Sequence, residues 1–156
     1  FSLTLAPHAS AAFFAKGKRI EKSVYQAEES YMKMFSTIEG VVSPSYLPSE
    51  SADMGMYAAG LGCNSDNWLQ WDNMFSCKGG DASIRYACKE KTAFTVSVNG
   101  EEITWFENLS TGDDSSAWET VNFRVNLAKG LNNVRLINAT GSMPSIDCLT
   151  LRRAQR

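Results

Sequence analysis

The sequence has 156 residues but only one histidine, His8. A zinc site built from several imidazoles would therefore lack ligands. A Ser-His-Asp triad would have to use this single residue close to the N-terminus. The scarcity of histidine argues against both kinds of catalytic centre.

Net charge and long apolar runs are scarce as well. The 15 lysines and arginines nearly balance the 17 aspartates and glutamates, which leaves a net charge of −2. Nucleic acids and anionic membranes are recognised by basic patches, so we expect neither as a partner. No apolar run approaches the roughly 18 residues of a membrane span. The composition, 44% hydrophobic and 21% charged, is typical of a folded domain and not of a disordered chain.

Residues 1–19 differ from the rest of the chain. The segments 1–5 and 11–15 predict two strands of another unit, and 16–19 (KGKR) is typical of a linker. The alternative is a flexible N-terminal arm. Because the sequence opens on Phe1 without a methionine or a signal peptide, we expect a processed product or an excised piece.

Alternation of apolar and polar residues dominates after residue 40 and predicts β-strands. In the segment 92–98, Phe94, Val96 and Val98 share one face, and Asn99-Gly100 then predicts a tight hairpin. The same pattern predicts strands over 67–73, 82–87, 103–106, 121–127, 134–137 and 146–151. Short strands separated by glycine-containing turns predict an all-β protein, an antiparallel β-sandwich.

Two segments before residue 67 are less regular. Residues 27–35 are interpreted as a strand that leads into a loop. Residues 36–66 contain Pro44 and Pro48 and are rich in serine and glycine, which predicts a long irregular segment. Such segments inside a compact domain are often functional.

Nine short motifs follow one another in the order found in a known family. They are YQAE (25–28), GLG (60–62), NWLQW (67–71), IRYA (84–87), VSVNG (96–100), WETV (118–121), VNL (125–127), GLNNVRL (130–136) and ID (146–147). Through them the chain from Val24 to Leu151 resembles carbohydrate-binding module family 35, close kin of family 6. The resemblance implies a jelly-roll sandwich of the galactose-binding-domain type over residues 20–156, with an oligo- or polysaccharide as its partner.

The segment LTLAPHA (3–9) is similar to the last strands of the β-domain that closes family 27 glycoside hydrolases, the α-galactosidases. This resemblance implies a fragment from the C-terminus of a larger secreted hydrolase. The module would then direct the catalytic domain of the same polypeptide to galactose-containing polysaccharide. We expect a monomer with a secreted or periplasmic location.

Three oxygen-bearing side chains suggest a metal site. Gln26 and Glu28 are two apart on an expected strand, so they should leave one face about 7 Å apart. Asp147 shares a face with Leu149 at the border of the core, where a carboxylate needs a partner. The resemblance implies a structural calcium at Gln26, Glu28 and Asp147, with loop carbonyls from the region of Asp53. The alternative is that Glu28 and Asp147 are solvated or bound to backbone N–H groups.

Sugar sites combine aromatic faces with planar polar groups. The resemblance places such a site in loops at one edge of the sandwich. Antiparallel geometry should bring together the loop entering strand 67–73, the exit of strand 82–87 and the loop before Asp147. The candidate binding residues there are Asn64, Asp66, Lys91 and Asn138, with Tyr46 as an aromatic platform and Tyr57 as a weaker addition.

Each candidate also has a structural interpretation. Asparagine and aspartate are common turn formers, Tyr46 could cover the core, and Lys91 could be solvated. Trp68 and Trp71 are three apart on a strand and face opposite sides, so at least one should be in the core. Trp105 and Trp118 are ambiguous between core and surface.

The sequence departs from the family at two places. The loop before the final strand is GSMP (141–144), where relatives often carry an aromatic residue. Ser145 stands where asparagine or aspartate is common. These departures keep open a second interpretation, a structural or docking module of the hydrolase that binds no sugar.

Nothing in the sequence proposes a catalytic site. Glycosidases need two carboxylates roughly 5 to 9.5 Å apart across a cleft. Neighbouring acids such as Glu101-Glu102 diverge on a strand, and Asp113-Asp114 falls in a turn-like segment. A pair brought together from distant segments stays open, but we expect no enzyme activity.

The four cysteines allow three pairings. Cys63 and Cys77 flank one expected strand and should lie at opposite ends. Cys63 enters that strand and Cys88 leaves its presumed neighbour, which predicts a Cys63–Cys88 disulfide. Cys148 on the last strand is expected to be a buried thiol.

Overall fold

The computed structural model describes residues 17, 21–32, 43–76, 79–112 and 117–153. Predictions for residues 1–19 lie outside these ranges, apart from Gly17. The elements are, in chain order, β1 (Val24–Gln26), η1 (Ala27–Glu29), β2 (Tyr31–Met32), β3 (Ser45–Pro48), η2 (Asp53–Gly55), β4 (Met56–Ala59), β5 (Trp68–Ser76), β6 (Gly80–Ala87), β7 (Thr92–Val98), β8 (Glu101–Leu109), β9 (Glu119–Val125), β10 (Gly130–Ile137) and β11 (Ser145–Arg153).

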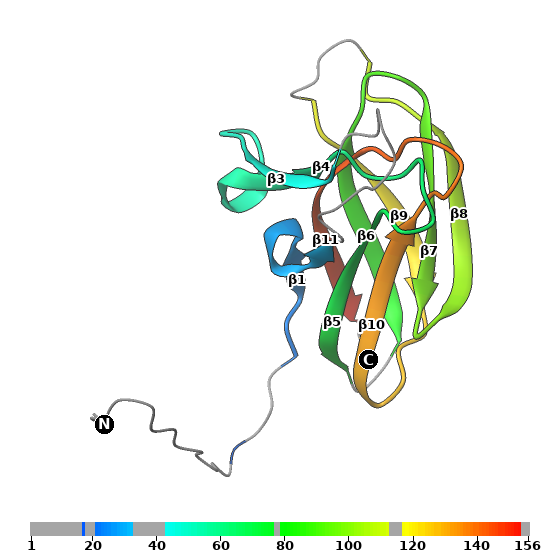
Figure 1. Cartoon of the computed structure of the whole chain (residues 1–156). Coiled ribbons are helices and arrows are strands. Elements are labelled where there is room, and N and C mark those ends of the chain that lie inside the picture. Colours follow the sequence, from blue (N-terminus) through cyan, green and yellow to red (C-terminus); the bar gives the residue numbers. More distant parts are fainter. Residues whose placement is uncertain (1–16, 18–20, 33–42, 77–78, 113–116, 154–156) are drawn as a thin grey trace, which may run out of the picture.

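The strands form two facing antiparallel sheets (Figure 1). One sheet has the order β3-β4-β11-β6-β9, with β1 also paired to β11, and the other has the order β2-β5-β10-β7-β8. The β3–β4 hairpin and β1 lie to one side of the sandwich (Figure 1). The predicted all-β, antiparallel β-sandwich is confirmed.

The core lies between the sheets and is formed by alternate residues of the strands. Phe94, Val96 and Val98 are buried, as the alternation predicted. Asn99 and Gly100 have φ of 52° and 86°, the positive values that a tight two-residue hairpin requires. Trp71 is fully buried, while Trp68 is only partly buried and carries the Arg135 guanidinium 4.2 Å from its ring centroid. The prediction that one of these two tryptophans is in the core is confirmed.

The interpretation of residues 36–66 as irregular is wrong for part of that segment. The strands β3 and β4 form a hairpin in which Ser45 pairs with Ala59 and Pro48 with Met56. Pro48 is tolerated because β3 is an edge strand, where a missing N–H breaks no ladder. Residues 27–29 are also not a strand, since they form the 3₁₀ turn η1.

The described residues contain no helix with the length and apolar character needed to span a membrane.

The predicted disulfide is wrong: Cys63 and Cys88 are free thiols. The prediction assumed that the strands they flank are neighbours, but β5 and β6 belong to different sheets. The Cys88 thiol donates instead to the Leu109 carbonyl, 3.3 Å away. Cys148 is buried, as expected, and burial raises the pKa of its thiol to about 11. Cys77 lies outside the described residues.

We expect the cysteines to differ in reactivity. Alkylation of the native protein with iodoacetamide should modify Cys63 rapidly, because it is exposed, and should leave Cys148 unmodified until the protein unfolds. Peptide mass mapping with and without prior reduction measures both. Recovery of a linked Cys63–Cys88 peptide without reductant would contradict the structure.

Candidate functional site

The three loops that were predicted to meet at one edge do meet. Gly62 and Ser142 form an isolated bridge, and the Cys63 N–H donates to the Gly141 carbonyl at 2.8 Å. Ser145, at the start of β11, pairs with Ala87 at the end of β6. A Cβ on Gly62 would lie 2.5 Å from the Gly141 oxygen, so this close approach of the loops requires glycine.

Asn138 supports this edge and does not present its amide to a ligand. Its buried side chain donates to the carbonyls of Ala93 (3.0 Å) and Ser142 (3.3 Å). Its Oδ1 accepts the N–H groups of Thr140 (3.3 Å) and Gly141 (3.0 Å). The amide therefore has backbone partners on both its nitrogen and its oxygen, which fixes the turn before β11.

The other predicted residues lie at separate places. Asn64 Oδ1 accepts the Asp66 N–H at 2.9 Å in a turn before β5, the turn-forming alternative considered for these side chains. Lys91 and Asn138 line a shallow groove of about 330 Å³ beside Trp105. The Tyr46 hydroxyl donates to the Ser30 carbonyl at 2.6 Å, and its ring packs against the core. Only Tyr57 of the six lines the cleft described next.

A cleft of about 320 Å³ opens beside the start of β11, within the size range of small-molecule sites. We call it the Tyr57–Trp118 cleft after its two aromatic residues. Tyr57 comes from β4 and Trp118 from the residues before β9, and their rings meet edge to face with centroids 5.5 Å apart. The remaining lining residues are Pro48, Ser49, Ala87, Cys88, Lys89 and Ser145. The cleft thus offers aromatic surface together with hydroxyl groups and an ammonium group.

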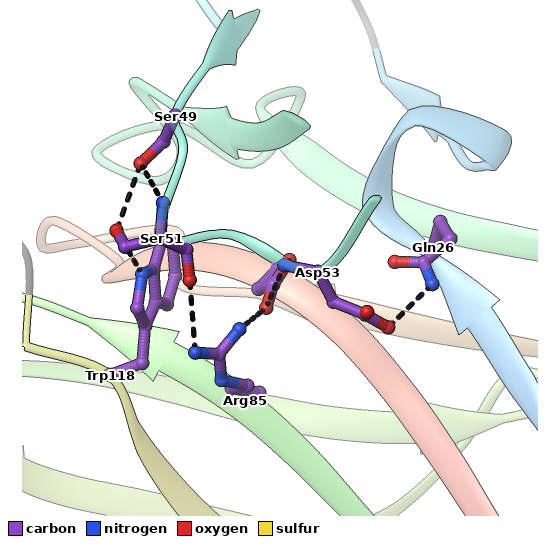
Figure 2. Close-up of polar contacts among 7 residues, drawn as sticks. Gln26, Ser49, Ser51, Asp53, Arg85 and Trp118 are labelled. Atoms are coloured by element: carbon purple, nitrogen blue, oxygen red, sulfur yellow. Dashed lines mark hydrogen bonds and ion pairs between the residues drawn. The ribbon is translucent and has the colours of Figure 1, made fainter. Parts of the chain in front are cut away.

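Trp118 is ambiguous between core and surface from the sequence alone. Its indole N–H donates to the Ser51 hydroxyl at 3.0 Å, and the Arg85 guanidinium lies 5.1 Å from its ring centroid (Figure 2). The only sequence signal was an aromatic residue at the boundary between a polar loop and an alternating strand. That signal does not tell a cleft residue from a core residue.

Three of the four predicted metal ligands, Gln26, Asp53 and Asp147, are joined by hydrogen bonds, and Glu28 lies in η1 beside Gln26. Asp147 is fully buried, and both of its carboxylate oxygens accept the Asp53 N–H, at 3.0 and 3.1 Å. The Arg85 guanidinium forms an ion pair with the same carboxylate. Asp53 Oδ2 accepts the side-chain amide of Gln26 at 2.8 Å (Figure 2). Burial raises the pKa of Asp147, and the Asp53 N–H and Arg85 act in the opposite direction.

Glu28 and Asp147 do not have the regular strand geometry that the sequence predicted. Glu28 lies in η1 and not two residues along a strand from Gln26. Asp147 lies at a register shift of β11, between Ile146 opposite Tyr86 and Cys148 opposite Arg85. Ile146 and Leu149 are both in the core although they are three apart, because the bulge interrupts the alternation.

The oxygen donors of this set match the ligands that calcium prefers. Gln26 Oε1 and Glu28 Oε2 are buried without a hydrogen-bond partner, which is costly unless another group binds them. Among the described residues, however, no group of three or more His, Cys, Asp or Glu side chains is arranged to hold a metal ion. The donor chemistry fits calcium, and the two unpartnered oxygens are the observation that favours a cation.

No protein-family model and no curated protein matches the sequence. Solved structures do. A family 35 carbohydrate-binding module from Clostridium thermocellum has a TM-score of 0.71 and 23% identity over 83% of this chain and 98% of that one. The fold is that of a family 35 module. A CBM35 from Paenibacillus barcinonensis gives 0.67 and 18% identity over 85% of this chain and 100% of that one.

A larger protein contains the same fold. The exo-β-1,3-galactanase of Phanerochaete chrysosporium, solved with β-1,3-galactotriose, gives a TM-score of 0.70 and 18% identity. The match covers 85% of this chain but 29% of the galactanase. The same sandwich is therefore found in structures that span a single module and in one part of a larger enzyme.

The role of Asn138 predicts a loss of stability on substitution. Asn138→Ala should lower the free energy of unfolding by about 2–3 kcal/mol, because it removes a buried amide and leaves backbone groups unpaired. Urea unfolding followed by circular dichroism measures this. Asn122→Ala on the exposed side of β9 is the control, expected within about 0.5 kcal/mol of wild type. Equal stability of the two variants would contradict the structural role.

Proposed function

We propose that this protein is a non-catalytic carbohydrate-binding module and that the Tyr57–Trp118 cleft binds the sugar. The observation that carries the proposal is the cleft itself, with two aromatic rings beside Lys89 and two serines. Aromatic rings pack on the C–H faces of sugars, and polar groups orient the hydroxyls. The likeness to family 35 modules supports this assignment.

The proposed ligand is a galactose-containing or related polysaccharide, and the proposed role is to hold an attached glycoside hydrolase on that substrate. Two structural neighbours favour this class: the galactanase solved with β-1,3-galactotriose and a GH26-CBM35 β-(1,4)-mannanase of Podospora anserina. We further propose that the hydrolase belongs to family 27, that the protein is secreted or periplasmic, and that it acts as a monomer.

Substitution of the cleft aromatics tests the sugar site. Trp118→Ala and Tyr57→Ala should each weaken binding about tenfold or more, the loss expected for a buried aromatic contact. Isothermal titration calorimetry with galacto- and manno-oligosaccharides measures it. Trp105→Ala is the matched control, because Trp105 is an exposed tryptophan on the other sheet and should leave affinity unchanged.

Two outcomes would count against this site. Unchanged affinity in Trp118→Ala would place the sugar elsewhere on the protein. A wild-type protein that binds no oligosaccharide of the panel, and no galactan or mannan in affinity electrophoresis, would favour the structural or docking module.

We also propose that Gln26, Glu28, Asp53 and Asp147 hold a structural calcium ion. The unpartnered Gln26 and Glu28 oxygens and the buried Asp147 carboxylate support the proposal. A bound divalent cation would offset the burial of negative charge and link β1, η1, η2 and β11. Its contribution would be to stability and loop order rather than to chemistry on the sugar.

Calcium removal should lower the melting temperature. A ligand that binds only the folded state at 100 times its dissociation constant adds about 2.7 kcal/mol to stability, so we expect a shift of several degrees between EDTA and excess calcium in differential scanning calorimetry. Glu28→Gln should reduce this shift, and the exposed control Glu102→Gln should not. An identical melting temperature in EDTA and in calcium would contradict the proposal.

A further inference from the structure

Two residues from other segments of the chain contact Trp118, which lies just before β9. Arg85, on β6, places its guanidinium 5.1 Å from the indole centroid. Ser51, between β3 and η2, accepts the indole N–H through its hydroxyl at 3.0 Å. These two contacts hold the ring from its face and from its polar edge (Figure 2). They are independent of the other wall of the cleft, Tyr57.

Arg85 also contacts both Ser51 and Asp147. Its Nη2 donates to the Ser51 carbonyl at 3.1 Å, and its Nη1 pairs with the Asp147 carboxylate. The Arg85 side chain is 33% exposed, whereas that of Asp147 is 0% exposed. The guanidinium thus connects the fully buried Asp147 carboxylate to Ser51, which binds the Trp118 indole.

From this arrangement we propose that Arg85 is a positioning residue, which holds Trp118 in the orientation from which the cleft binds a glycan. The inference rests on the proposed sugar site. Arg85 is not among the residues that line the cleft, so it acts on the ligand through Trp118. This role extends the binding machinery to an arginine and a buried carboxylate that do not line the cleft.

The geometry requires arginine in particular. A planar guanidinium can donate from two nitrogens in different directions and stack on an aromatic face at the same time. A lysine ammonium could pair with Asp147 but could not also reach Ser51 and cover the indole from one position. Lysine should therefore preserve the buried ion pair while releasing Trp118.

Two substitutions test the inference. Arg85→Met removes every contact and should weaken glycan binding about tenfold relative to wild type. Arg85→Lys keeps the charge beside Asp147 and should still lose several-fold. The controls are Arg124→Met and Arg124→Lys on the neighbouring strand β9, where the arginine side chain is 93% exposed and pairs only loosely with Asp81, at 3.5 Å. Both control variants should bind as wild type does.

A readout without sugar separates positioning from general stability. In ¹H–¹⁵N spectra of the ligand-free protein, the Trp118 indole resonance, assigned with Trp118→Phe, should move in both Arg85 variants. The indole resonance of Trp71, buried in the core and bonded to the Gln26 carbonyl at 2.8 Å, should stay in place. If Arg85→Met fails to fold because Asp147 is left unpaired, Arg85→Lys decides.

An unmoved Trp118 resonance, or full glycan affinity in Arg85→Lys, would overturn the inference. These results differ from failure of the proposed function. If the proposed function is wrong, the wild-type protein binds none of the galacto- and manno-oligosaccharides, while the Trp118 indole resonance still moves when Arg85 is substituted.

Discussion

The buried carboxylate of Asp147 is the constraint that organises this edge of the sandwich. A carboxylate with no exposed surface is costly unless its oxygens are bonded. The Asp53 N–H and the Arg85 guanidinium supply those bonds, yet burial still raises the pKa of Asp147. The requirement brings together η2, β6 and β11, segments far apart in the sequence. An apolar residue at the bulge would impose no such partners.

The arrangement of the cleft depends on the same need to bond the buried Asp147 carboxylate. Trp118 lies just before β9 and outside any strand, and Tyr57 lies in the four-residue strand β4. What fixes Trp118 is the path from Asp147 through Arg85 and Ser51. A binding surface held in place before the ligand arrives loses less conformational entropy on binding. Under the proposed function, the buried charge would contribute to recognition without contacting the sugar.

The sequence could predict what depends on neighbours along the chain. The strand 92–98 and its Asn99-Gly100 turn follow from alternation and from backbone preferences of two residues. It could not predict which strands share a sheet, because pairing depends on partners distant in sequence, and the Cys63–Cys88 disulfide was wrong for that reason. The β3–β4 hairpin was missed because proline disfavours a central strand but is allowed at an edge.

The candidate site was also predictable only in part. The meeting of three loops at one edge followed from antiparallel geometry, but residue type did not show which side chains were available there. The sequence suggested Asn138 as a sugar-binding residue, yet its amide forms hydrogen bonds with backbone groups. The loop before β11 turns Met143 and Pro144 inward, so the expected aromatic position is part of the core. The aromatic surface comes instead from Tyr57 and Trp118, and Ser145 lines the cleft with a small side chain. Of the departures at 141–145, only Ser145 lines the cleft, and the aromatic surface of Tyr57 and Trp118 does not depend on it.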